Sequence, residues 1–137
     1  MDNHYTLTDA EFELQFRTAS LDPNLFSHEA HLRLAWIHIR KYGVERAIQN
    51  ICSQLQDFTI SVGARDKYNK TVTIAAIRAV YHFMLRSNTD NFLDFIAENQ
   101  RLKTSFKALL ASHYVTDIFK SEQAKQAYLE PELLPFD

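Results

Sequence analysis

Glycine and proline are scarce in this chain, and their scarcity constrains the fold more than any other feature of the sequence. Only two glycines (Gly43, Gly63) and three prolines (Pro23, Pro131, Pro135) occur in 137 residues. Sandwiches, barrels and doubly wound sheets depend on these residue types for their many turns. The sequence therefore predicts an all-α protein.

The length and the hydrophobic content of the chain suit one domain. With 137 residues, 46% of them hydrophobic, the chain can bury a continuous core without disulfides or structural metals. We expect a single helical domain over residues 1–137, because two domains of half this length would each be marginal. The lone Cys52 lies among apolar residues at helical spacing, so we expect it in the core rather than as a nucleophile.

The distribution of charge and of apolar residues argues against two classes of partner. Fifteen Lys and Arg against seventeen Asp and Glu give a net charge of −2, and both signs are spread along the chain, so no nucleic-acid partner is expected. No stretch approaches the roughly 18 uninterrupted apolar residues that span a bilayer, and the N-terminus does not resemble a signal peptide. We expect a cytoplasmic protein without membrane contact.

Capping signals and apolar spacing predict a helical bundle of five main helices. The capping box from Thr8 to Glu11, the cap Ser27 and the stop at Gly43 are the strongest of these signals. The main helices are expected over residues 8–19, 28–42, 44–62, 71–85 and 90–96, and shorter ones over 104–114 and 121–129. The proline-containing tail over 130–136 is expected to pack as an extended strap.

The helix over residues 28–42 carries the residues most suggestive of a functional site. On a helical wheel, His28, His31, Ala35, His38 and Tyr42 fall within an arc of about 80°, with apolar residues on both sides. The histidines are therefore expected on the buried face, where an imidazole without a partner costs about 1–3 kcal/mol. A polar pocket would supply partners. We predict that His31 is a general acid or base and that His28 orients it or shares its role.

The connection into the fourth helix is the second half of the predicted site. It places three cations beside a helix N-terminus, whose unpaired N–H groups attract anions. If this connection, residues 64–73, closes over the histidines, its polar side chains complete the pocket. The predicted ligand-binding residues are Arg65, Lys67, Tyr68, Asn69, Thr71, Thr73, Trp36 and His38. Glu29, Arg33 and Arg40 are expected on the far face of the helix over 28–42. The alternative is that Thr71 only caps the fourth helix and that water solvates the cations.

Metal binding is a weaker alternative for the two histidines. His28 and His31 are three residues apart, whereas the zinc-protease pattern needs two histidines four apart. A catalytic zinc uses three protein ligands, so a mononuclear site would need a third ligand such as Asp66 or His113. We predict no cofactor, and a divalent metal on His28 and His31 is the less favoured alternative.

Three segments carry a resemblance to a known family. They are Phe-Ser-His-Glu-Ala-His-Leu-Arg-Leu-Ala-Trp at 26–36, Lys-Tyr-Asn-Lys-Thr-Val-Thr at 67–73, and the stretch over 119–135 that ends in an acidic, proline-containing strap. In order and spacing they resemble an uncharacterised family of small bacterial all-helical proteins, over nearly the whole chain. The resemblance implies a histidine where this chain has Asn69. Because asparagine is a poor ligand for zinc or iron, a metal site is less favoured here, although Asn69 can still form hydrogen bonds to a small molecule.

Two functions of different class fit the sequence. The first, which we favour, is a binding protein or enzyme for a small, anionic molecule, with His28 and His31 in a pocket closed by residues 64–73. The second is a non-enzymatic helical interaction or structural module, such as a homodimer, whose histidines only satisfy the interior. Ten phenylalanines are more than a core of this size needs, so exposed Phe or Tyr would mark a contact surface. The sequence assigns no reaction.

Overall fold

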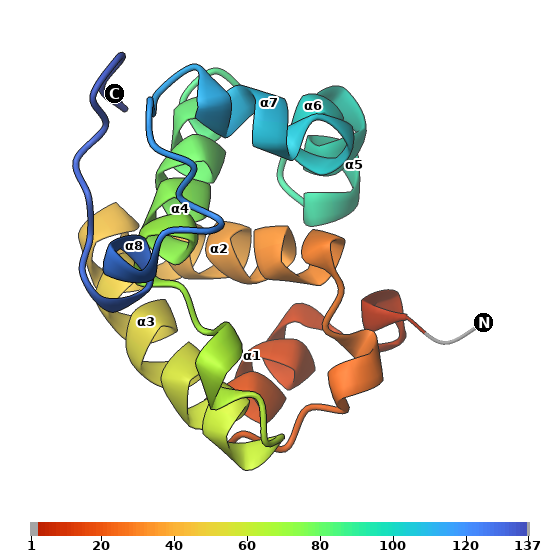
Figure 1. The fold of residues 1–137 in the computed structure, drawn as a ribbon. Coiled ribbons are helices and arrows are strands. Elements are labelled where there is room, and N and C mark those ends of the chain that lie inside the picture. The colour runs from red at the N-terminus through yellow and green to blue at the C-terminus, as the bar shows by residue number, and fades with distance from the viewer. Residues whose placement is uncertain (1–2, 137) are drawn as a thin grey trace. The chain divides into compact units, whose positions relative to one another are not determined.

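The structure is a computed structural model that describes residues 3–136. Within this range the protein is all-α, with eight α-helices, three short 3₁₀ turns and no strand (Figure 1). Five of the helices have seven residues or more, which confirms the predicted fold class. The helices are α1 (Asp9–Arg17), α2 (His28–Tyr42), α3 (Val44–Ser61), α4 (Lys70–Met84), α5 (Phe92–Glu98), α6 (Arg101–Thr104), α7 (Phe106–Ala111) and α8 (Glu122–Gln126). The 3₁₀ turns are η1 (His4–Thr6), η2 (Pro23–Leu25) and η3 (Arg65–Lys67).

The predicted capping signals define the starts of the first helices. Thr8 and Glu11 form the reciprocal capping box: the Thr8 hydroxyl accepts from the Glu11 N–H at 3.1 Å, and the Glu11 carboxylate accepts from the Thr8 N–H at 2.9 Å. Ser27 caps α2 by accepting from the Ala30 N–H at 3.2 Å. Gly43, with φ of +87°, joins α2 to α3 in a backbone conformation that side chains disfavour. The prediction that α2 covers residues 28–42 is confirmed.

Most predicted helix bounds differ from the structure by one or two residues, and the larger differences lie in the second half of the chain. The helix expected over 104–114 is the shorter α7, preceded by Ser105, whose backbone leaves the helical region, and by α6, which was not expected. The helix expected over 121–129 ends at Gln126, because the backbone beyond it is held by α4. The N-cap of α4 is Asn69 rather than Thr71, because the Asn69 side chain accepts from the Val72 N–H and Thr71 already lies within the helix. Residues 127–136 form no helix, as expected for the strap.

The contacts of the chain divide it into two compact units, one ending at Tyr68 and one beginning at Asn69. We call them the N-terminal unit and the C-terminal unit and describe each by itself. A single domain over residues 1–137 stays a prediction.

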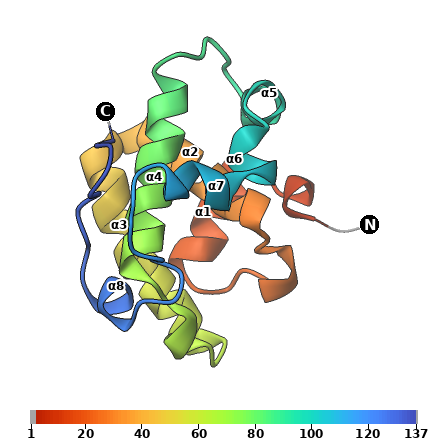
Figure 2. The same ribbon diagram turned by 45° about the horizontal axis from the view of Figure 1, so that its top comes forward.

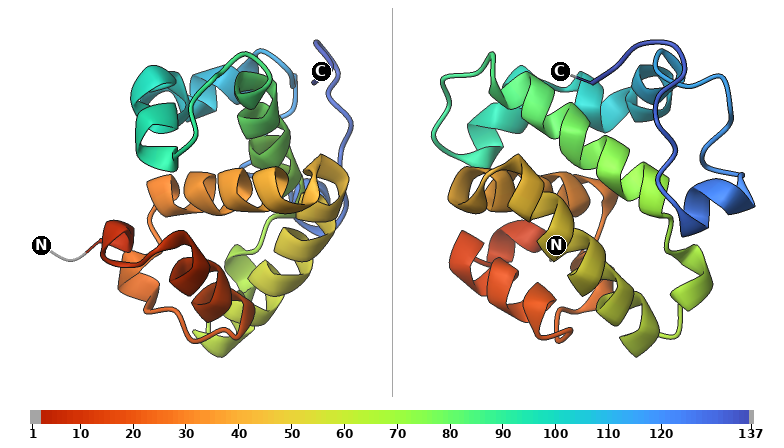
Figure 3. Two further views of the ribbon diagram at one scale, coloured as in Figure 1. Left: turned by 180° about the vertical axis from the view of Figure 1, so that it is seen from behind. Right: turned by 90° about the vertical axis from the view of Figure 1, so that its left-hand side faces the viewer.

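In the N-terminal unit, α2 and α3 pack together from their junction at Gly43, and α1 contacts both of them (Figure 3). Phenylalanine rings fill the space between these helices. The ring centroids of Phe16 and Phe26 are 5.0 Å apart, and Phe58 lies 5.1 Å from Phe26 and 5.4 Å from Phe16. The abundance of phenylalanine therefore serves the interior. None of the ten is among the exposed large hydrophobic residues, and all ten lie within the described range.

In the C-terminal unit, α4 packs against α8 and against the segment that follows α7 (Figure 2). The core residues here are Ala75, Leu110, Tyr114, Ile118 and Ala124. The first turn of α4 holds the chain's last segment through Thr71, whose hydroxyl donates to the Ala127 carbonyl at 2.9 Å and accepts from the Leu129 N–H at 3.0 Å. This pairing fixes the start of the strap.

Candidate functional site

The two histidines at the centre of the predicted site lie on the first turn of α2, and both are exposed. The expectation that they occupy the buried face is therefore wrong for His28 and His31, whereas it is confirmed for His38. The physical reason is that a helical wheel gives the direction of a side chain around the axis. It does not say how far along the axis the neighbouring helices extend.

The imidazole of His31 is fixed in place although it is exposed. It stacks on Phe26 with the ring centroids 3.8 Å apart and an angle of 21° between the planes. Phe26 is itself held by the phenylalanine core of the N-terminal unit. Desolvation by the surrounding protein and electrostatic repulsion from the neighbouring His28 lower the pKa of His31 to about 4. Since the side chain is exposed, water opposes the desolvation, but both causes act in one direction and favour the neutral ring at pH 7.

The predicted ligand-binding residues of η3 divide into exposed cations and a buried phenol. Arg65 and Lys67 are exposed. Tyr68 is half-buried, with its hydroxyl oxygen shielded from solvent near Cys52 and Gln56 of α3, and burial raises the pKa of Tyr68 well above its usual value. The cations are accessible to a ligand, whereas the Tyr68 hydroxyl packs against its own unit.

Asn69, Thr71 and Thr73 use their polar groups within the C-terminal unit. Asn69 caps α4 by accepting from the Val72 N–H at 3.0 Å, and its amide donates to the Ile118 carbonyl at 2.8 Å. Thr73 donates to the Asn69 carbonyl at 2.7 Å. Thr71 is buried, where it holds the strap. All three residues were predicted to bind a ligand, but in the structure they hold α4 and its connections together.

A second polar cluster lies at the other end of α2. His38 is only 1% exposed, and neither of its ring nitrogens has a hydrogen-bond partner within residues 3–136. The buried Glu13 of α1 accepts from the Tyr42 hydroxyl at 2.5 Å and from the Lys41 ammonium at 3.0 Å. Desolvation raises the pKa of Glu13, but the hydrogen bonds from Tyr42 and Lys41 outweigh it and lower the pKa below its usual value. For His38, desolvation dominates and lowers the pKa to about 4, with Glu13 opposing it.

A groove of about 330 Å³ opens beside this cluster, between α1 and α2. Its lining residues are Asp9, Ala10, Glu13, Trp36, Ile37, Arg40 and Lys41. The Arg40 guanidinium lies 4.9 Å from the centre of the Trp36 ring system. Trp36, predicted as a ligand-binding residue, thus reaches a groove, but that groove does not include His28 or His31.

A buried ion network around Arg33 was missed by the sequence analysis, which placed Arg33 on the exposed face. Arg33 is 5% exposed and donates to the Asp9 carboxylate at 2.8 and 3.1 Å, to the Leu7 carbonyl at 2.9 Å and to the His4 carbonyl at 2.6 Å. His4 is buried as well, with its Nε2 atom 3.0 Å from the Glu29 carboxylate. The partners lie 24 to 29 residues away in sequence, so no local pattern could indicate them.

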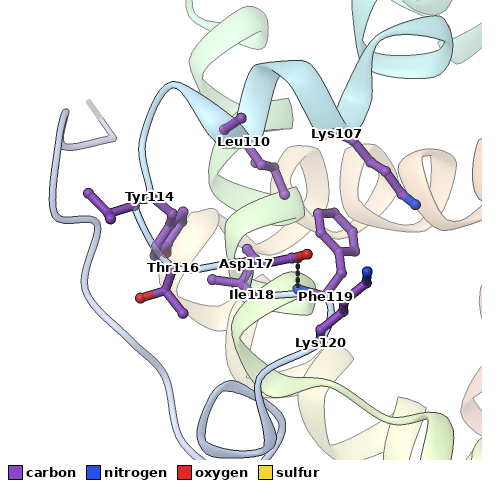
Figure 4. A pocket seen from close by; sticks show the side chains of 10 residues that line it. Lys107, Leu110, Tyr114, Thr116, Asp117, Ile118, Phe119 and Lys120 are labelled. Atoms are coloured by element: carbon purple, nitrogen blue, oxygen red, sulfur yellow. Dashed lines mark hydrogen bonds between the residues drawn. The ribbon is translucent and has the colours of Figure 1, made fainter.

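The C-terminal unit carries a second groove, of about 320 Å³, that no sequence pattern indicated (Figure 4). It is lined by residues of α7 and of the segment that follows: Lys107, Leu110, Ala111, Tyr114, Val115, Thr116, Asp117, Ile118, Phe119 and Lys120. Lys107 and Lys120 lie at the same end, with both ammonium groups on the same side of the Phe119 ring in this view (Figure 4). The two lysines are separated by a turn of the backbone, which sequence spacing does not reveal.

Two further findings concern alternatives raised by the sequence. Among the described residues, no group of three or more His, Cys, Asp or Glu side chains is arranged to hold a metal ion. None of the helices within residues 3–136 combines the length and the apolar character needed to cross a membrane.

Comparison of the chain with known protein families, curated proteins and solved structures finds no match. The family resemblance of residues 26–36, 67–73 and 119–135 therefore stays a prediction.

Proposed function

We propose that the protein binds a small polar molecule at the first turn of α2, with His31 as the main contact and His28 beside it. The observation that supports this proposal best is the state of His31, whose ring is exposed, held by Phe26 and favoured in its neutral form at pH 7. A neutral imidazole held in one plane can accept a hydrogen bond or a proton from a ligand without first losing a proton or becoming ordered.

Positive charge within the N-terminal unit favours an anion. The first-turn N–H groups of α2 give the helix start a partial positive charge, and Arg65 and Lys67 add two exposed cations to the same unit. We also propose that residues 64–73 close the site. Because Asn69, Thr71 and Thr73 have structural roles, the closure depends on Arg65 and Lys67. If a reaction occurs at the site, His31 is the proposed proton acceptor, because its neutral ring has one unprotonated nitrogen and is exposed to a ligand.

The test is a binding screen read out at the histidines. Small carboxylates, phosphates and neutral analogues are added to the protein, and the ring C–H signals of His28 and His31 are followed by NMR. We expect at least one anion to shift both rings, and His31→Ala to weaken its binding about ten-fold or more. His82→Ala, which removes a half-buried histidine of the other unit, is the matched control and should leave binding unchanged. Binding that His31→Ala does not weaken, or no binding by any anion, would refute the proposal.

A non-enzymatic interaction module is the second candidate, favoured by exposed aliphatic residues. Val115, Leu93 and Leu85 are 71%, 59% and 57% exposed. No phenylalanine is among the exposed large hydrophobic residues in the described range, whereas Tyr5 and Tyr42 are 36% and 38% exposed, so the exposed aromatic residues that this function predicted are found only in part. Sedimentation equilibrium over a range of concentrations tests the homodimer. The third candidate, a mononuclear metal protein, is tested by metal analysis of purified wild type and His28→Ala/His31→Ala.

A further inference from the structure

We propose that the groove of the C-terminal unit binds an amphipathic carboxylate. The carboxylate would lie at the end of the groove that holds Lys107 and Lys120, and the hydrocarbon part would lie along Phe119 (Figure 4). This site is on a different unit from the histidines of α2, and it does not depend on the function proposed for them.

The floor of the groove is preformed. Leu110, Tyr114 and Ile118 line it, and the same three residues belong to the core of the C-terminal unit, where they are at most 4% exposed. A ligand can therefore bind without rearranging the fold. A volume of about 320 Å³ lies near the lower end of the range of roughly 300–1,000 Å³ for small-molecule sites, which suits a short chain or a single ring.

Two unpaired cations stand at one end of this apolar floor. Lys107 and Lys120 are exposed, and neither forms an ion pair within residues 3–136. The groove also contains one carboxylate, that of Asp117, but its Oδ1 atom accepts from the Phe119 N–H at 3.1 Å and holds the local turn. The lysine end therefore keeps an excess of positive charge, which attracts an anion.

Lys107 lies beside the aromatic ring that forms part of the apolar wall of the groove. Its ammonium lies 5.3 Å from the centre of the Phe119 ring, within reach of a cation–π interaction. Phe119 is in turn packed edge-on against Phe106, with the ring centroids 6.3 Å apart. A ligand that follows the Phe119 ring thus meets the ammonium directly.

The opposite end of the groove has little capacity to donate hydrogen bonds. The Tyr114 hydroxyl donates to the Leu129 carbonyl at 2.9 Å, and the Thr116 hydroxyl donates to the Glu132 carboxylate at 3.3 Å. The lysine ammonium groups are the side-chain donors of the groove that remain for an anionic head. Two ammonium groups beside a mostly apolar wall match a singly charged carboxylate with an apolar body better than a strongly hydrated phosphate, which needs more donors.

The experiment titrates the full chain with octanoate and follows backbone amides by ¹H–¹⁵N NMR. Octan-1-ol, which has the chain without the charge, and acetate, which has the charge without the chain, are titrated in parallel. We expect octanoate to shift amides over residues 107–120 and to bind at least about ten-fold more tightly than either of the other two. Lys107→Gln/Lys120→Gln should raise the dissociation constant for octanoate about five- to ten-fold.

The matched control is Lys103→Gln/Lys125→Gln, which removes the same charge from the same unit outside the groove. It should leave octanoate binding unchanged, and the helical circular dichroism of both variants should match the wild type because all four side chains lie outside the core. Equal binding of octan-1-ol, equal binding of acetate, or equal weakening by both double variants would each overturn the proposal. So would amide shifts confined to the first turn of α2 and abolished by His31→Ala, which would instead support the site proposed there.

Discussion

Replacing His38 should remove a large part of the pH dependence of stability. The imidazole is 1% exposed without a hydrogen-bond partner in residues 3–136, and desolvation lowers its pKa from 6.5 to about 4, with Glu13 opposing and Lys41 and Arg17 assisting. Between these pKa values the unfolded chain binds a proton at His38 that the folded chain does not. The free energy of unfolding therefore falls as the pH falls, by about 2 kcal/mol from pH 7.5 to pH 5 and about 3 kcal/mol by pH 4.

Two substitutions separate the charge of His38 from its polarity. His38→Leu has a similar volume, cannot titrate and leaves no buried nitrogen unsatisfied, so it should raise the free energy of unfolding by about 1 kcal/mol at pH 7.5. His38→Gln also cannot titrate but keeps a buried polar group, so it should not be stabilised. Both variants should lose the contribution of about 2 kcal/mol to the pH dependence.

The assay is urea unfolding at pH 7.5, 6.5, 5.5 and 5, followed by helical circular dichroism and by the fluorescence of Trp36, the single tryptophan. The difference between variant and wild type at each pH cancels the titration of other groups. If His38→Leu keeps the wild-type pH dependence, the folded-state pKa of His38 is not lowered and the reasoning fails. Strong destabilisation by His38→Leu at pH 7.5 would show that the nitrogens have partners, such as bound water.

Three further predictions concern buried polar groups. Arg33→Met should lower the free energy of unfolding, measured in urea titrations, by about 3–5 kcal/mol, because it leaves Asp9 and two carbonyls without their donor. The control Arg46→Met, at an exposed position, should change the free energy of unfolding by less than about 0.5 kcal/mol. Thr71→Val should cost about 1–3 kcal/mol and accelerate hydrogen exchange at the Leu129 amide; unchanged exchange would contradict the role of Thr71 in holding the strap. Asn69→Ala should lower the stability by about 1–2 kcal/mol in thermal unfolding. Asn69→Asp should lower it less, because the carboxylate still caps α4 and only the donor to the Ile118 carbonyl is lost. Equal losses in the two variants would show that the cap is unimportant.

The predicted site was only partly recoverable from the sequence. The wheel of α2 correctly placed His38 on the buried face. It misplaced His28 and His31, which are exposed although their neighbours Ala30 and Leu32 are buried, because a wheel does not say which side of a given turn other segments cover. Asn69, Thr71 and Thr73 are polar residues at a helix start, and the sequence cannot tell whether their partners are a ligand or a distant backbone. In the structure the partners of Asn69 and Thr71 are carbonyls 49 and 56 residues away.

The sequence by itself determined the all-α class, the capping box at Thr8, the bounds of α2 and the break at Gly43. The reason is that helix propensity, capping and backbone strain depend on residues only a few positions apart. Only the tertiary structure decided that Arg33 is buried with His4 and paired with the exposed Asp9, and that Lys107 and Lys120 lie at one end of a groove. Burial of a charge depends on which distant segment supplies its partners, and the convergence of two lysines depends on the turn between them. Neither the burial of Arg33 nor the position of the two lysines produces a periodic pattern in the sequence, so only the folded structure reveals them.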